Sequence, residues 1–208
     1  MTKNIFVFSG HPKVDSLSGA IADAYQRGAI DAGAQVRRMD LGDMNFEMSF
    51  ESYGDMPAAE PDILAWQDAV NWSDHLMLVH PCWWGTMPAK TKALFDRALT
   101  PGFAYKYHAR GVAWDKLLLG KTADAIITAD TPPIIDTLLY RRAARRILKN
   151  QILGFCGIKT HNAVQFGSVK LADEEKIQRW LAQAHKLGAK AARRKIVKVE
   201  PVPQEVAV

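Results

Sequence analysis

Short apolar runs without polar alternation recur along the chain and indicate strands that are buried on both faces of a sheet. Residues 5–8 and 76–79 are the clearest of these runs. Residues 122–128 and 157–163 predict two further strands. Residues 35–41 predict another, and its arginines favour a place at the sheet edge.

Helical periodicity separates these runs. From Leu17 to Tyr25 the apolar residues recur every three or four positions, which gives one apolar helix face. Asp15 or Ser16 can cap the start of this helix, and Gly33 can end it. Further helices are predicted over residues 62–72, 90–99, 136–151 and 173–194.

Strands that alternate with helices along one chain predict a parallel sheet with helices on both faces. We therefore expect an α/β fold, a flavodoxin-like three-layer sandwich whose five-stranded parallel sheet has the order 2-1-3-4-5. Residues 1–195 would form this single domain. Residues 196–208, with two prolines among valine and glutamate, predict a loosely ordered C-terminal tail.

The composition fits one domain and excludes several classes of protein. The 208 residues are 48% hydrophobic and 24% charged, as in ordinary globular chains. No apolar run approaches the roughly 18 residues of a membrane span, and no signal-peptide pattern is present, so we expect a cytoplasmic protein. Cys82 and Cys156 lack metal-ligand spacing and are expected to be free thiols, with no metal site. The net charge of +5 permits a phosphorylated cofactor but, without a recognised motif, does not indicate nucleic-acid binding.

The turn after the first strand has the chemistry of a phosphate site. A helix that starts directly after a buried strand offers unpaired N–H groups and the positive end of its dipole. Ser16 and Ser18 add hydroxyl donors, and His11 can add another. Capping of the helix alone would also explain Ser16, and neither a Walker A nor a GxGxxG loop is present.

The turn after residues 76–79 is aromatic. Trp83 and Trp84 lie between Pro81 and Gly85, and two adjacent indoles at a strand end offer a flat face for a planar ring. The alternative is that both indoles simply pack in the core. In the predicted strand order this turn and the phosphate turn flank the same crevice, so together they predict a site for a flat, phosphorylated cofactor.

Several short stretches together resemble the NAD(P)H:quinone oxidoreductase family. They are His11-Pro12 with Ser16, Asp43-Met44-Asn45-Phe46, Pro81-Cys82-Trp83-Trp84-Gly85 with Pro88-Ala89, Phe95-Asp96-Arg97, Gly102-Phe103-Ala104-Tyr105 and Phe155-Cys156-Gly157. The resemblance implies a homodimeric flavoenzyme that moves two electrons as hydride from NADH or NADPH through a flavin to quinones. The flavin would carry the chemistry, and the protein would position and tune it.

The resemblance also implies roles for individual residues. The cofactor phosphate would be held by His11, Ser16, Leu17 and Ser18. The flavin ring would be lined by Pro81, Cys82, Trp83, Trp84 and Gly85. Trp84 would also form part of the nicotinamide and quinone pocket. Tyr105 and Tyr107 would close this pocket from the second subunit of the dimer, so that the active site would need both subunits.

After the fourth predicted strand the chain departs from the family pattern. The family has Thr-Thr-Gly-Gly at this turn, and Thr128, Ala129, Asp130 and Thr131 stand here instead. Loss of both glycines would change how closely the backbone approaches the flavin, and Asp130 would bring a carboxylate near it. The family's downstream Tyr has Tyr140 as its nearest counterpart, although Tyr140 could equally serve in helix packing.

The sequence leaves the finer choices open. The absence of a clear extension to wrap an adenine half favours FMN over FAD. Azo or nitro compounds are alternative acceptors, because any compound that stacks on a flavin can be reduced by it. A regulatory flavin-binding subunit with little turnover is a third hypothesis, suggested by the altered turn at Asp130 and the arginines between residues 141 and 146.

Overall fold

The computed structural model describes residues 2–53, 55–108 and 110–196. Its core is a five-stranded sheet with the order β2-β1-β3-β6-β7, and every neighbouring pair is parallel. The strands are β1 Asn4–Ser9, β2 Gln35–Asp40, β3 His75–Pro81, β6 Thr122–Thr128 and β7 Lys159–Phe166. The predicted parallel sheet and its strand order are confirmed, with the more polar β2 at one edge.

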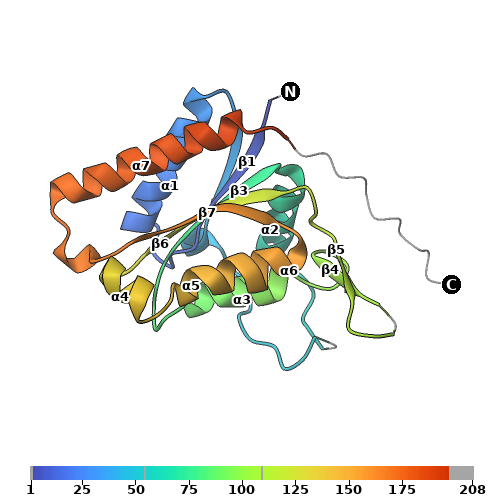
Figure 1. The fold of residues 1–208 in the computed structure, drawn as a ribbon. Helices are drawn as coiled ribbons and strands as arrows, with labels where there is room; N and C mark the ends of the chain where they lie inside the picture. The colour runs from blue at the N-terminus through green and yellow to red at the C-terminus, as the bar shows by residue number, and fades with distance from the viewer. Residues whose placement is uncertain (1, 54, 109, 197–208) are drawn as a thin grey trace.

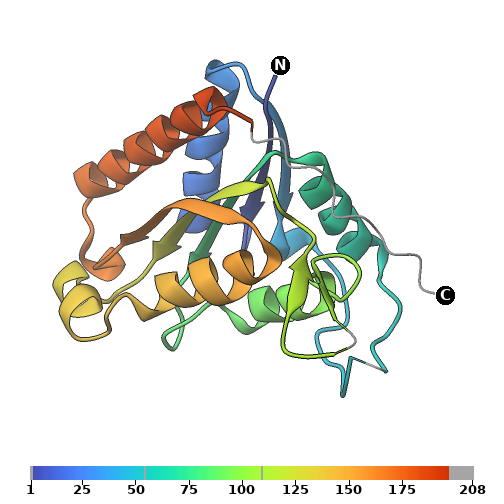
Figure 2. The same ribbon diagram turned by 45° about the vertical axis from the view of Figure 1, so that its right-hand side comes forward.

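Helices lie on both faces of this sheet (Figure 1). The helices are α1 Leu17–Asp31, α2 Pro61–Trp72, α3 Ala89–Ala98, α4 Pro133–Leu138, α5 Ala143–Arg146, α6 Gly154–Cys156 and α7 Glu174–Arg193. Figures 1 and 2 show α1 and α7 on one face, and α2, α3 and the α5–α6 segment on the other. Among the described residues, no helix is long and apolar enough to cross a membrane.

The alternation of side chains along β1 explains why residues 5–8 of this strand are all apolar. Ile5 and Val7 pack against α1 and α7, whereas Phe6 and Phe8 pack on the opposite face with Trp66 of α2. All four strand residues are at most 1% exposed. Because both faces are covered, a polar residue at any of these positions would be buried without a partner.

The single helix predicted over residues 136–151 is wrong in its middle. α4 ends at Leu138, and both Arg141 and Arg142 have positive φ angles, of 48° and 58°. The backbone N–H of Arg142 donates to the carbonyl of Asp136, and the buried Asp136 carboxylate pairs with Arg145. This tertiary ion pair turns the chain back at the point where helix propensity alone would continue it. The helix then resumes as α5, a π-helical turn Ile147–Leu153, and α6.

Two further boundaries differ from the prediction. The last strand runs from Lys159 to Phe166 rather than over residues 157–163, because Gly157, with φ 97°, ends α6. The stretch after α3, for which the sequence predicts neither a strand nor a helix, contains an antiparallel hairpin of β4 Tyr105–Tyr107 and β5 Trp114–Lys116. Of the predicted loose tail, residues 197–208 lie outside the described residues.

Candidate functional site

A cavity of about 190 Å³ lies where β1, β3 and β6 end, at the carboxyl edge of the sheet. Ligands of open α/β sheets bind at this edge, at the point where the strand order reverses. The residues that line the cavity are His11, Leu17, Ser18, Pro81, Cys82, Trp83, Thr128, Ala129, Asp130 and Val169. The three turns predicted from the sequence therefore meet at one cavity.

The first wall of the cavity is the start of α1. Of the two predicted caps it is Ser16 that serves, because its hydroxyl accepts from the backbone N–H of Gly19 at 3.1 Å. Ser18 is 1% exposed and lines the cavity, yet its hydroxyl has no hydrogen-bond partner within the described part of the chain. A buried hydroxyl without a partner is costly, so this group is suited to a ligand oxygen. Together with the positive helix end it forms a fitting phosphate site.

His11 completes this wall. Its Nδ1 lies 2.9 Å from the backbone nitrogen of Lys13 and 3.0 Å from the carbonyl oxygen of Lys13, so either tautomer of the ring finds a partner there. Burial lowers the pKa of His11 from its ordinary value, which favours the neutral ring. Both of these contacts use Nδ1, so Nε2 can bind an anion when it carries the proton.

The second wall is the aromatic turn after β3. The backbone groups of Trp83 and Thr86 exchange two hydrogen bonds, of 2.8 and 3.1 Å, around the intervening residues Trp84 and Gly85. Both intervening residues have positive φ angles, 50° and 81°, as a two-residue hairpin turn requires. Glycine adopts this conformation freely, but in Trp84 it costs about 1 kcal/mol or more. The turn places Trp83 at the cavity and leaves Trp84 fully exposed beside it.

Cys82 lies in the same turn and is a poor nucleophile there. It is half-buried in the cavity wall. Burial, and less strongly the nearby Asp136 carboxylate, raises the pKa of its thiol. A protonated thiol packs as a small apolar group, so the role of Cys82 at this cavity is in shape rather than in covalent chemistry.

The third wall consists of the turn after β6 and the segment after β7, and the sequence did not predict the second of these at the site. Thr128, Ala129 and Asp130 line the cavity, and Val169, which follows β7, lines it with them. The backbone N–H of Lys170 donates to the Asp130 carboxylate at 2.8 Å. The sequence holds no pattern that points to Val169, because its place depends on this long-range hydrogen bond.

The three candidate tyrosines do not line the cavity of their own chain. Tyr105 packs against Tyr107 and Phe155, with ring centroids 5.1 and 5.0 Å apart. Figures 1 and 2 show the β4–β5 hairpin far from α4, at the other end of the helices on this face. Tyr140 is exposed in the turn after α4. Four other candidate residues do not line the cavity but lie close to lining residues in the sequence: Ser16, Trp84, Gly85 and Thr131.

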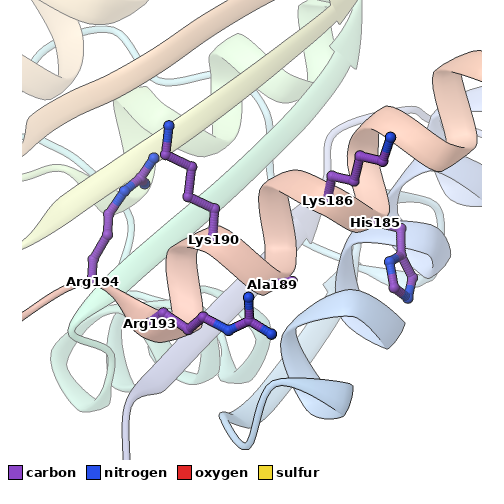
Figure 3. Close-up of a pocket in the computed structure, with 6 residues that line it drawn as sticks. All are labelled: His185, Lys186, Ala189, Lys190, Arg193 and Arg194. Atoms are coloured by element: carbon purple, nitrogen blue, oxygen red, sulfur yellow. The ribbon is translucent and has the colours of Figure 1, made fainter.

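A larger hollow, of about 410 Å³, runs along the last turns of α7 (Figure 3). Its side chains are mostly cationic, and Figure 3 shows Lys190 and Arg194 extending to the same side of the helix. Arg194 already forms an ion pair with the buried Asp124, whose carboxylate accepts hydrogen bonds from its guanidinium at 3.1 and 3.2 Å. All its lining residues come from α7 and the residue directly after it, so it lacks the polar groups that converge from several elements on the cavity at the strand ends. No group of three or more potential metal ligands occurs among the described residues.

Comparison with known proteins agrees with this architecture. Residues 3–187 match the family described as flavodoxin-like fold. A Haemophilus influenzae protein named as an uncharacterized NAD(P)H oxidoreductase is 30% identical over 83% of this chain and 87% of its own length. Among solved structures, an NAD(P)H:quinone oxidoreductase from Methanothermobacter marburgensis aligns with a TM-score of 0.75 at 22% identity, over 92% of this chain and all of the other. An FMN-dependent NADH-azoreductase from Bacillus anthracis, in complex with FMN, aligns with a TM-score of 0.68 at 16% identity, over 91% and 100% of the two chains.

The strand order, the cavity at the strand ends and the match over residues 3–187 define a flavodoxin-like α/β protein. The chain belongs to this family, and within it to the NAD(P)H oxidoreductases represented by the Haemophilus influenzae relative.

Proposed function

We propose that the chain is a flavin-dependent NAD(P)H oxidoreductase that passes two electrons, as hydride, from NADH or NADPH to quinones. The observation that carries this proposal is the pairing of two unlike walls in one cavity. The hydroxyl of Ser18, which has no partner among the described residues, lies at the start of α1, and Trp83 lines the same cavity. One wall suits a phosphate and the other suits a flat ring, and a flavin mononucleotide joins these two groups.

In this proposal the chain binds and orients the flavin, and the flavin, when bound, supplies the redox chemistry. His11, Ser18 and the start of α1 hold the phosphate, with Ser16 fixing the helix end and Leu17 beside it. Trp83 lies along the ring, with Pro81, Cys82, Gly85 and Trp84 in the same turn. Thr128, Ala129, Asp130 and Thr131 border its remaining edge. We favour FMN over FAD, and the complex of FMN with a protein of the same fold is consistent with this choice.

A homodimer is part of the proposal. Trp84 is fully exposed next in sequence to Trp83, which lines the cavity, and an acceptor and the nicotinamide would lie against it. Tyr107, which is 60% exposed on the β4–β5 hairpin, is available to cover this opening in a second copy of the chain, with Tyr105 packed behind it. Tyr140 is the remaining candidate for a contact with the flavin. It follows α4, the helix that comes directly after the turn at Asp130. Cytoplasmic location, where NADH and NADPH are supplied, also belongs to the proposal.

An absorption spectrum of the purified protein, followed by anaerobic addition of NADH or NADPH, tests the proposed function. A flavin spectrum that bleaches with the nucleotide and returns with a quinone is expected. A protein that takes up neither flavin nor nicotinamide would overturn the proposal. Azo compounds are the second class of acceptor, because an azoreductase shares the fold. Turnover with a panel of quinones, azo dyes and nitro compounds separates these substrates.

A further inference from the structure

The chain after β7 crosses directly over the turn after β6. We call residues 167–171 the strap. A Cβ atom added to Gly167 would lie 2.6 Å from the carbonyl oxygen of Thr131, so the strap's backbone touches the turn and only glycine fits there. Ser168 then has a φ angle of 57°, which residues other than glycine rarely adopt. The strap is therefore built against the cavity wall and does not simply pass near it.

Three hydrogen bonds tie the end of β7 and the strap to this turn, and one of them depends on a side chain. Ala129 N–H donates to the carbonyl of Phe166 at 2.9 Å, and Val169 N–H donates to the carbonyl of Ala129 at 3.1 Å. Both are bonds between backbone groups. The third is the bond from Lys170 N–H to the Asp130 carboxylate, at 2.8 Å. A hydrogen bond to an ionised acceptor is stronger than a neutral one, so Asp130 fixes the centre of the strap.

The strap borders the part of the cavity that the start of α1 forms. Val169 lines the cavity together with Leu17 and Ser18, and Val169 and Leu17 pack on the same apolar cluster. The strap is therefore a neighbouring wall to the start of α1, which carries the proposed phosphate site. A mononucleotide ends at its phosphate, whereas a dinucleotide must continue past it. Asp130 also lines the cavity, and its carboxylate, bonded to Lys170 N–H, adds negative charge to the wall that the strap forms, which disfavours a second phosphate beside the strap.

We propose that Asp130 is a specificity-determining residue that makes the site select FMN over FAD, because it holds the strap closed through Lys170 N–H. This inference rests on the proposed function. Asp130 acts on the ligand in two ways, by tethering Val169 as a wall and by its charge. Both effects favour the ligand with one phosphate.

The ratio of the dissociation constants of FAD and FMN, measured by quenching of flavin fluorescence, tests this inference. The unaltered protein should bind FMN at least about tenfold more tightly than FAD. Asp130→Ala removes both the tether and the charge and should lower the ratio about tenfold. Lys170→Pro removes the donated N–H but keeps the carboxylate, so it should lower the ratio too, whereas Lys170→Ala keeps the N–H and should leave it unchanged. Asp130→Asn keeps an acceptor without the charge and should fall between.

Two outcomes would overturn the inference: a preference for FAD in the unaltered protein, or an unchanged ratio in both Asp130→Ala and Lys170→Pro while FMN still binds. Circular dichroism and the melting temperature establish that each variant is folded. If Lys170→Pro does not fold, the comparison of Asp130→Ala with Asp130→Asn still decides, because equal ratios in these two would exclude the tether. Failure of the unaltered protein to bind either flavin would overturn the proposed function instead.

Discussion

The imidazole of His11 stands edge-on to the indole of Trp83, with ring centroids 5.6 Å apart and an interplanar angle of 81°. His11 follows β1 and Trp83 follows β3, so this contact joins the two turns that flank the reversal of strand order. It fixes the indole while the other nitrogen of His11 stays free for an anion. The phosphate wall and the flat wall of the cavity are therefore held at a set distance by one aromatic pair.

Replacement of Trp83 tests the flat wall. Trp83→Ala removes both the indole face and its contact with His11, and we expect FMN affinity to fall about tenfold, since aromatic pairs contribute roughly 0.5–1.5 kcal/mol beyond the area they bury. Trp83→Phe keeps a flat ring and should lose less. Trp84→Ala is the neighbouring control, because Trp84 does not line the cavity. Fluorescence titration with FMN measures all three, and an equal loss in Trp83→Ala and Trp84→Ala would contradict the assignment.

Replacement of Ser18 tests the phosphate wall. A hydrogen bond to a charged group contributes about 1.5–3 kcal/mol, so Ser18→Ala should weaken FMN binding about 10- to 100-fold. Riboflavin has the same ring without the phosphate, and its affinity should be unchanged. The empty protein should be as stable as before or slightly more so, because the buried hydroxyl has no partner in the described chain. A parallel loss of riboflavin affinity would show that Ser18 acts on the ring or on the fold.

The sequence predicts the central sheet well because burial on both faces dictates it. Strands β1 and β3 contain continuous apolar runs, β6 is apolar apart from Thr122, Asp124 and Thr128, and the strand-to-helix turns after them carry their own capping and turn residues. The chain between Pro133 and Phe166 is predicted poorly for the opposite reason. There the path depends on the pairing of Asp136 with Arg145 and on the left-handed backbone of Arg141 and Arg142, which no local pattern specifies.

The candidate site follows the same division. The lining residues that lie directly after a strand, from His11 to Asp130, could be predicted because parallel strands bring their carboxyl ends together. Val169 could not, since long-range hydrogen bonds between the segment after β7 and the turn after β6 bring it to the cavity. The roles of Tyr105, Tyr107 and Tyr140 stay predictions. One chain by itself does not bring these tyrosines to the cavity.

His80 predicts how stability depends on pH. It is 2% exposed, and burial lowers the pKa of its ring from 6.5 to about 4, although a hydrogen bond with the carbonyl of Pro81 opposes this. Between these two pKa values the unfolded chain binds a proton at His80 and the native protein does not, so protonation favours the unfolded state. The contribution of His80 is therefore complete above pH 6.5 and is lost as the pH falls toward 4, by up to about 3 kcal/mol.

Chemical denaturation between pH 7.5 and 4.5 checks this dependence. His80→Gln cannot take up a proton, so its stability should fall less steeply over this range than that of the unaltered protein, whatever its absolute value. His185 is the matched control, because it is half-exposed beside Asp31. His185→Gln should keep the steep dependence. Equal slopes in all three proteins would exclude His80 as the origin.

Two glycines set the close approach of α1 and α7. A Cβ atom on Gly188 would lie 2.1 Å from the carbonyl oxygen of Tyr25, and one on Gly28 would lie 2.0 Å from that of His185. Because each contact is with backbone, the helices would have to move apart. We expect Gly188→Ala to destabilise the protein by about 1–3 kcal/mol despite the better helix propensity of alanine. Gln183→Ala, on the exposed face of α7, should stay within about 0.5 kcal/mol in the same urea titration.

The proposed homodimer predicts that two defective chains can restore each other. Ser18→Asp places a carboxylate at the phosphate wall and should abolish FMN binding in its own chain, whereas Tyr107→Ala should impair the site of the other subunit. In a mixed dimer one site then carries both defects and the other carries neither. Random pairing should return about a quarter of the normal activity, although each variant alone is nearly inactive.

Co-expression of the two variants with different affinity tags allows the mixed dimer to be isolated, and light scattering should give twice the 23.1 kDa mass of one chain. The isolated mixed dimer should bind about one FMN per two chains, because only the chain with Ser18 intact retains the phosphate wall. If Tyr107 acted on its own chain, the chain with Ser18 intact would be the one that lacks Tyr107. The mixed dimer would then bind FMN but have no more activity than Tyr107→Ala, which separates a shared active site from two independent ones.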